Sequence, residues 1–151
     1  MIDQEKEMKS MMTFGLFSSR TDEWATPVRL FQELDAEFHF DLDPCATSEN
    51  HKCPDYYTKE ENGLLQNWGG GRRVFCNPPY GKAMPAWVQK CSEEAKKPDT
   101  LVVMLIPART DTAYFHDYIY KKAKEIRFIR GRLHYNDAKQ AAPFPSMIVI
   151  F

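Results

Sequence analysis

The chain has 151 residues, of which 43% are hydrophobic and 27% are charged, and its formal net charge is −1. This length suits one domain with a hydrophobic core, and the composition excludes a chain that is disordered throughout. The nearly neutral charge excludes nucleic-acid binding through overall positive charge alone, and no apolar stretch approaches the length of a membrane span.

The first 20 residues show no clear periodicity, so we expect a variable leader over 1–20 and one domain over 21–151. Residues 1–12 are charged and polar and lack the apolar core of a secretory signal, which predicts a cytoplasmic protein. The four cysteines are scattered without a CxxC pair, so we interpret them as structural thiols and expect no metal.

The first predicted helix covers residues 27–36. Thr26 is a favourable N-cap and Pro27 suits the first helical position. Apolar residues then recur at helical spacing, at Val28, Leu30, Phe31, Leu34 and Phe38. Residues 38–43 alternate and predict a short strand that stops before Pro44. Residues 44–71 are rich in turn formers and predict mostly loop, with one short helix near 59–66.

The second half of the chain alternates between strand and helix patterns. Strands are predicted at 73–76, 100–106, 125–129 and 146–151, and helices at 85–96 and 112–122. The strand at 100–106 is a continuous apolar run, as in strands buried on both faces. The pattern predicts an α/β fold with a compact, mostly parallel, Rossmann-like sheet and helices on both faces. Ligands bind such sheets at the carboxyl ends of the strands.

Asn77-Pro78-Pro79-Tyr80 directly follows the predicted strand at 73–76 and is the most specific chemical pattern in the chain. Prolines fix the backbone and lack N–H groups, and the asparagine side chain adds an acceptor oxygen. The Asn77 oxygen and the Pro78 carbonyl are therefore predicted to accept both hydrogens of a planar NH2 group. Accepting them makes the nitrogen a better nucleophile toward a methyl group through positioning and dipoles. Tyr80 is predicted to stack on a base flipped out of the helix.

These residues resemble the (D/N/S)PP(Y/F/W) signature of amino-methyltransferases that use S-adenosylmethionine (AdoMet). More closely, the chain resembles the compact phage and prophage DNA N-6-adenine-methyltransferases. The matching segments cover nearly all of 22–151. They are Asp22-Glu23-Trp24-Ala25-Thr26-Pro27, Asp41-Leu42-Asp43-Pro44-Cys45-Ala46, Asn62-Gly63-Leu64 with Trp68, residues 75–81, Leu105-Ile106-Pro107-Ala108-Arg109-Thr110-Asp111, Phe128-Ile129-Arg130-Gly131-Arg132-Leu133 and Pro143-Phe144-Pro145-Ser146. The resemblance implies a Rossmann-like methyltransferase fold and methyl transfer from AdoMet to N6 of adenine in DNA.

The resemblance also implies an AdoMet site. Its expected residues are Trp24, Thr26, Pro27, Asp43, Pro44, Asn62 and Asn77. Asp43 is expected to face the methionine amino group of AdoMet, and the helix after Thr26 its carboxylate. No glycine-rich turn follows Asp43, so the adenosine pocket is expected from loop residues, with Tyr56, Tyr57, Asn62 and Leu64 as candidates.

DNA is the expected partner, with no membrane, and the chain is expected to be a monomer or a weak homodimer. Residues 121–139 carry seven basic and two acidic side chains, a net charge of +5 (seven minus two), and this run is interpreted as a phosphate-contacting edge. The residues assigned to DNA are Arg109, Arg130, Arg132 and Tyr135. The resemblance further implies a role in protecting phage DNA from restriction.

Three alternatives stay open. The same slot serves the N4 amino group of cytosine. A protein-glutamine methyltransferase uses such a motif to grip a side-chain amide, which the basic run disfavours. A DNA-binding protein with an inactive cofactor site is the third, and the intact 77–80 motif argues against it.

Overall fold

The computed structural model describes residues 24–151. The first helix, α2 (Val28–Phe38), starts after Pro27 and ends where His39 adopts a left-handed conformation with φ 54°. Its apolar face buries Leu34 and brings Phe31 against Phe75, with ring centroids 5.2 Å apart. The helix therefore covers one face of the sheet to which Phe75 belongs. The expectation for residues 1–20 lies outside the described residues.

The described chain forms a six-stranded sheet with the order β2-β1-β3-β4-β6-β5. The strands are β1 (Leu42–Ala46), β2 (Asp55–Thr58), β3 (Arg73–Cys76), β4 (Leu101–Pro107), β5 (Glu125–Phe128) and β6 (Ser146–Ile150). Strands β2, β1, β3 and β4 pair in parallel, whereas β6 pairs antiparallel with both β4 and β5. Five strands thus run in one direction, which confirms the mostly parallel α/β sheet.

The order of the strands reverses between β1 and β3. After β1 the chain adds β2 on one side, and it then returns to place β3 on the other side of β1. In open α/β sheets this switch point leaves a crevice at the carboxyl ends of the two strands. Asp43 lies within β1, and Asn77 directly follows β3, so both lie close to that crevice.

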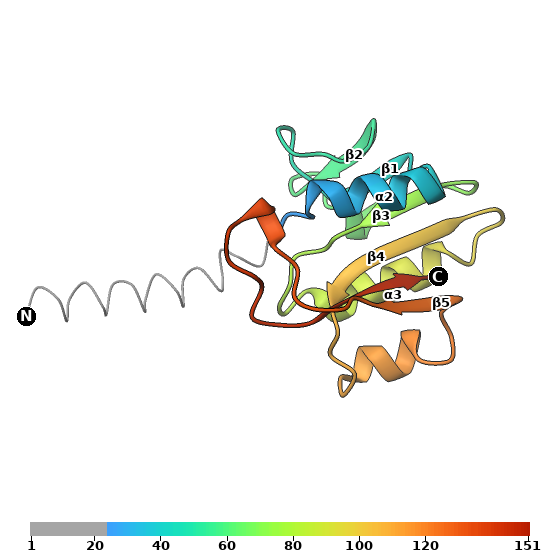
Figure 1. Cartoon of the computed structure of the whole chain (residues 1–151). Coiled ribbons are helices and arrows are strands. Elements are labelled where there is room, and N and C mark those ends of the chain that lie inside the picture. The colour runs from blue at the N-terminus through green and yellow to red at the C-terminus, as the bar shows by residue number, and fades with distance from the viewer. Residues whose placement is uncertain (1–23) are drawn as a thin grey trace, which may run out of the picture.

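Helices cover both faces of the sheet (Figure 1). Phe75 and Cys76 are neighbours in β3, so their side chains point to opposite faces. Phe75 contacts Phe31 of α2, whereas the thiol of Cys76 lies beside that of Cys91 in α3 (Met84–Glu94). The short π-helical turn η2 (Phe115–Ile119) contacts α3 and lies on its side of the sheet. Residues 102–106 of β4 lie between these helix layers, and their side chains are fully buried in the core.

The first strand lies further along the chain than predicted. Residues up to Phe38 are helical, and β1 passes through Pro44 instead of stopping before it. The pairing with β2 is irregular between Asp43 and Ala46. Proline is tolerated at such an irregularity because its missing N–H does not interrupt a regular ladder.

Two further predictions were wrong. Residues 55–58 form β2 at the edge of the sheet instead of a loop, and the helix near 59–66 is only the 3-10 turn η1 (Gly63–Leu65). The helix expected over 112–122 shortens to η2 and the turn before it, because Tyr120 becomes extended and Lys121 has φ 59°. Within residues 24–151, no helix is long and apolar enough to cross a membrane.

Candidate active site

A cavity of about 770 Å³ opens at the switch point between β1 and β3. This volume lies in the range of sites that hold small molecules and cofactors. The walls come from the segment before α2, β1 and the loop after it, β2, η1, and the end of β3. The lining residues are Trp24, Ala25, Thr26, Asp43, Cys45, Ala46, Thr47, Asn50, Lys52, Thr58, Lys59, Asn62, Gly63, Leu64, Phe75, Asn77, Pro78, Pro79, Trp87 and Asn136.

Asn77 is anchored by the segment that leads into α2. Its side-chain Nδ2 donates to the carbonyl of Trp24 and, at 3.0 Å, to Thr26 Oγ1. Thr26 is buried, and its hydroxyl is used here instead of capping the helix. The predicted N-cap role of Thr26 is therefore wrong. The first helical N–H, that of Val28, instead faces both carboxylate oxygens of Asp137 at 3.4 Å.

These contacts determine which way the Asn77 amide points. A carbonyl can only accept, so the atom that faces Trp24 must be the NH2 group. The other end, Oδ1, is buried and has no hydrogen-bond partner among the described residues. A buried acceptor without a partner costs about 1–3 kcal/mol. Asn77 therefore keeps one oriented acceptor in the cavity wall for a donor that the chain itself does not supply.

Pro78 and Pro79 also line the cavity, but Tyr80 does not. Tyr80 is 6% exposed, and its hydroxyl donates to the carbonyl of Leu105 at 2.9 Å. Burial and the neighbouring Tyr135 raise its pKa well above the ordinary value. The ring of Tyr80 meets Tyr135 edge to face, with centroids 5.8 Å apart. The ring of Tyr80 thus packs inside the core behind the motif, and its stacking on a base stays a prediction.

Asp43 is a buried carboxylate at the cavity wall. It is 4% exposed, and its oxygens accept from the backbone N–H groups of Cys45 at 3.2 Å and Lys52 at 2.9 Å. Burial raises the pKa of Asp43, and the two backbone hydrogen bonds oppose that shift. A cation bound beside Asp43 would stabilise its charged form.

The 62–64 turn closes the cavity against the carboxyl end of β1. Asn62 Oδ1 accepts from Leu64 N at 3.1 Å and shapes the turn. A Cβ on Gly63 would lie 2.1 Å from the Pro44 carbonyl oxygen, so only glycine allows this approach. Asn62 and Leu64 line the cavity as expected of candidate adenosine contacts.

Tyr56 and Tyr57 were wrong as candidates for the adenosine pocket. Both side chains line a separate hollow of about 360 Å³ with Asp55 and Arg72. Tyr56 stacks on His51 with ring centroids 4.0 Å apart. Neither tyrosine lines the main cavity, and the sequence of this edge strand has no pattern that shows which of its residues do so.

The cavity fits the AdoMet expected from the family resemblance. A buried carboxylate at Asp43 suits an ammonium group, and Lys52 beside it suits a carboxylate. Phe75 and Trp87, which are 1% and 5% exposed, contribute apolar atoms to the cavity wall from the core. Of the other residues assigned to the cofactor, Trp24 lines the cavity, whereas Pro27 and Pro44 belong to the framework behind it.

The exposed arginines and Tyr135 differ in what they offer to DNA. Arg109, Arg130 and Arg132 are exposed. Tyr135 is 2% exposed, and its hydroxyl is 2.7 Å from Ser146 Oγ, so the assignment of Tyr135 to a DNA contact was wrong. The buried Tyr135 side chain holds its loop against the sheet. The sequence around Tyr135 did not show that it would be buried.

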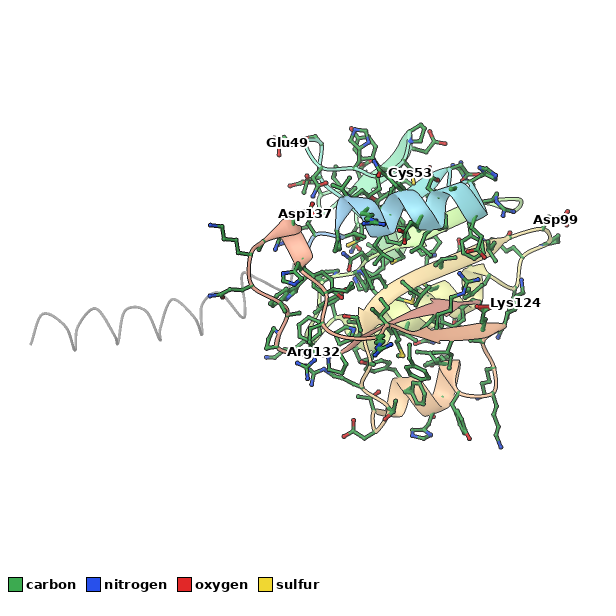
Figure 2. The ribbon with its side chains drawn as sticks, viewed as in Figure 1. Glu49, Cys53, Asp99, Lys124, Arg132 and Asp137 are labelled. Carbon is green, nitrogen blue, oxygen red and sulfur yellow. The ribbon has the colours of Figure 1, made fainter. Side chains whose placement is uncertain are left out.

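The basic run over 121–139 is divided between two ends of the molecule. Figure 2 shows Arg132 and Asp137 at the end where Glu49 lies, and Lys124 at the opposite end with Asp99. The reason is that β5 runs across the sheet between these two groups. Within β5, Arg127 pairs with Glu37 through two contacts of 2.6–2.7 Å. The run is therefore not one continuous phosphate-contacting edge.

Several cavity residues escaped the sequence analysis, namely Asn50, Lys52, Thr58, Lys59, Trp87 and Asn136. Most of them belong to loops or to the edge strand β2, where no periodicity marks a face. Asn136 reaches the cavity because residues 130–145 fold back onto the start of α2 (Figure 1).

Burial raises the pKa of Cys53 to about 12, so this thiol keeps its proton beside His51, whose ring nitrogen bonds the Cys53 carbonyl. Across residues 24–151, no group of three or more His, Cys, Asp or Glu side chains is placed to hold a metal ion.

Comparison with known proteins shows the family to which the chain belongs. The sequence model of the family described as DNA N-6-adenine-methyltransferase (Dam) matches residues 15–151. A DNA N-6-adenine-methyltransferase of Escherichia phage T1 is 34% identical over 113 residues, which are 74% of this chain and 46% of that protein. One of Haemophilus phage HP1 is 37% identical over 113 residues, 74% of this chain and 64% of that protein. The chain thus matches about half to two thirds of the length of these relatives.

Proposed function

Because the chain belongs to the DNA N-6-adenine-methyltransferase (Dam) family, we propose that it transfers a methyl group from AdoMet to N6 of adenine in DNA. The observation that carries the proposal is the buried Asn77 Oδ1, an oriented acceptor without a partner among the described residues. A slot that grips an NH2 group requires such an atom.

Different residues of the cavity contact the adenine base and the cofactor. Asn77 Oδ1 and the Pro78 carbonyl accept hydrogen bonds from the two hydrogens of the adenine amino group and hold its nitrogen toward the cofactor side of the cavity. AdoMet, when bound, supplies an electrophilic methyl group. Asp43 holds the amino group of its methionine part, and Asn62 and Leu64 face its adenosine part. Positioning and preorganised dipoles provide the rate, and no strong base is needed.

DNA is the proposed partner, and Arg109, Arg130 and Arg132 are its proposed phosphate contacts. Both relatives carry the name of DNA N-6-adenine-methyltransferases and come from phages, which supports adenine over cytosine and disfavours the protein-glutamine and inactive alternatives. We place the proposed activity in the cytoplasm of a bacterial host.

The test is nucleoside mass spectrometry of DNA incubated with the protein and AdoMet. We expect N6-methyladenine, and N4-methylcytosine as the sole product would refute the choice of base. Asn77→Ala is expected to lower the transfer rate at least about 100-fold, as for the loss of a preorganised hydrogen-bonding group.

AdoMet binding separates this effect from misfolding. Isothermal titration is expected to give a dissociation constant for Asn77→Ala within a few-fold of the wild-type value. Asn67→Ala removes an exposed asparagine that bonds Gly69 N outside the cavity, and it serves as the matched control with unchanged transfer. Full transfer by Asn77→Ala would contradict the proposed slot.

A further inference from the structure

Three consecutive residues, 24–26, hold two asparagines that are far apart in the sequence. Trp24 and Thr26 accept from Asn77 Nδ2, as described above. Ala25 between them exchanges two hydrogen bonds with Asn136. The Asn136 N–H donates to the Ala25 carbonyl at 2.8 Å, and the Ala25 N–H donates to Asn136 Oδ1 at 3.1 Å. Both asparagines line the same cavity.

The two amides are held in opposite senses. The backbone N–H of Ala25 is a donor, so the Asn136 atom that faces it must be the oxygen. This leaves the Asn136 NH2 group, which donates to no other residue in the described part of the chain. In Asn77 the NH2 group is used and the oxygen has no partner. The pair therefore offers one donor and one acceptor to a bound molecule.

The backbone at Asn136 is held in an unusual conformation. Its φ and ψ are 60° and 16°, and the next residue, Asp137, has φ 51°. Asparagine adopts this left-handed region more readily than most residues, but at a cost that surrounding contacts must offset. The bonds to Ala25 and the contacts of Asp137 with Val28 N supply that support.

Asn136 reaches the cavity from the other side of β3 than Asp43 does. The preceding residue, Tyr135, has its hydroxyl 3.3 Å from that of Tyr80 in the 77–80 motif. Its segment arrives from the β5 and β6 side of the sheet, whereas Asp43 and Thr58 belong to β1 and β2 on the other side of β3. Asp43 and Thr58 thus reach the cavity from one side of β3, and Asn136 reaches it from the other, beside the segment that holds Asn77.

We propose that Asn136 is a positioning residue for the methyl-acceptor base, donating from its side-chain NH2 to the ring nitrogen beside the amino group that Asn77 accepts. The inference rests on the proposed function. Adenine presents an N6 amino group next to the acceptor N7, a pattern that a single asparagine reads with both ends of its amide. In this cavity the acceptor is the side-chain oxygen of Asn77 and the donor is the side-chain NH2 group of Asn136. Thymine presents an acceptor at O4 in place of the amino group, and the pair excludes it.

The decisive variant is Asn136→Asp. It keeps an oxygen that accepts from Ala25 N, so the attachment of the loop remains, but it replaces the donor with an acceptor. We expect kcat/KM on adenine-containing oligonucleotides to fall about 10- to 100-fold, in line with the discrimination of a bidentate base contact. The AdoMet dissociation constant and the melting temperature are expected to stay near the wild-type values.

Base analogues identify the ring nitrogen. Wild-type protein is assayed on oligonucleotides that carry adenine, 7-deazaadenine or 1-deazaadenine at the target site. One deaza base is expected to lower wild-type kcat/KM about tenfold and to leave Asn136→Ala unaffected, because that variant has already lost the donor. Equal losses in both proteins with both analogues would overturn the proposal.

Asn67→Asp is the matched control. It makes the same exchange at an exposed asparagine that bonds Gly69 N outside the cavity, and it should keep wild-type kcat/KM. A loss of AdoMet affinity in Asn136→Asp that equals its loss of activity would assign the residue to the cofactor and overturn the proposal. Failure of the wild-type protein to methylate any DNA base would refute the proposed function itself, whereas wild-type activity in Asn136→Asp would refute only the role of Asn136.

Discussion

At the scale of single residues, the site depends on which partners the short polar side chains of Asn77, Thr26 and Asp137 bond. Asn77 was recognisable from its motif, but the reason for its orientation lies in Trp24 and Thr26, about fifty residues earlier. Thr26 looked like a helix cap because threonine commonly caps helices. In the folded chain its hydroxyl accepts from Asn77 instead, and Asp137 takes the place at the helix start.

Thr26→Val tests whether the hydrogen bond from Asn77 to the Thr26 hydroxyl orients Asn77. Valine has nearly the same shape but no acceptor, so Asn77 keeps only its bond to the Trp24 carbonyl and becomes less well oriented. We expect kcat to fall roughly 10- to 100-fold, since small misplacements of reacting groups cost rates of that order. The loss of one hydrogen bond should lower the free energy of unfolding by about 0.5–1.5 kcal/mol. Thr26→Ser keeps the hydroxyl and should retain most of the activity in the same steady-state assay.

The raised pKa of Asp43 leads us to expect that cofactor binding depends on pH. Burial raises its pKa, so it takes up a proton at higher pH than an ordinary aspartate. Protonation removes the charge that we propose to bind the ammonium group of AdoMet, and AdoMet affinity should therefore fall as pH is lowered through this raised pKa. Asp43→Asn should weaken AdoMet binding about 10- to 100-fold at neutral pH, as for a charged hydrogen bond of about 1.5–3 kcal/mol. Titration calorimetry across pH should also give a flatter profile for the variant.

The stability of the protein without cofactor should change in the opposite direction. The folded state binds the Asp43 proton more tightly than the unfolded chain does, so this residue's contribution to stability is largest below the unfolded pKa. That contribution is lost as pH rises through the folded pKa. Asp43→Asn should therefore flatten the dependence of the melting temperature on pH, while the loss of one of its two backbone hydrogen bonds lowers the melting temperature at every pH. An unchanged pH dependence in the variant would show that Asp43 is not the group that titrates.

At the scale of elements, the site depends on irregular connections more than on helices. The 62–64 turn and the 130–145 segment bring Gly63, Leu64 and Asn136 to the cavity, and neither is a regular helix or strand over most of its length. The predicted helices and inner strands form the rigid layers behind them. Strand β2 and turn η1 replace a region that appeared to be loop, because short irregular elements have no periodicity to recognise.

Gly63→Ala tests the contact between η1 and β1. The new Cβ would lie 2.1 Å from the Pro44 carbonyl oxygen, so the turn must move. We expect the free energy of unfolding to decrease by about 1–3 kcal/mol, as for an overpacked site, and AdoMet binding to weaken because Asn62 and Leu64 move with the turn. Gly70→Ala is the control, since its Cβ would meet only the Pro98 carbonyl oxygen at 3.6 Å. Chemical denaturation should show no change for Gly70→Ala.

At the scale of the whole molecule, the direction of the strands decides which charges share a surface. Arg130 and Arg132 follow the carboxyl end of β5, close in sequence to the segment that reaches the cavity, whereas Lys124 precedes β5 (Figure 2). Lys124 is thereby separated from Arg130 and Arg132, although the three lie within nine positions of one another. The net charge of a sequence window does not describe a surface when a strand crosses the sheet within that window.

DNA affinity should reflect this division. Arg130→Ala and Arg132→Ala should each weaken binding and reduce the slope of log affinity against log salt by about 1, as expected for one phosphate contact. Lys124→Ala changes the net charge by the same amount at the opposite end and should leave the slope unchanged. Fluorescence anisotropy over a series of salt concentrations provides the measurement. Equal slopes for all three variants would show that DNA does not bind at the cavity end.

The sequence by itself determined the α/β class, the strands β3, β4 and β6, and the 77–80 motif with its expected acceptor oxygen. These features follow from hydrophobic periodicity and from residues whose backbone chemistry is local, such as proline after a strand. Only the tertiary structure decided the hydrogen-bond partners of Asn77, the burial of Tyr80 and Tyr135, and the presence of Asn136 in the cavity. Each of these depends on contacts between residues separated by 11 to 111 positions, and no local pattern records which polar group meets which.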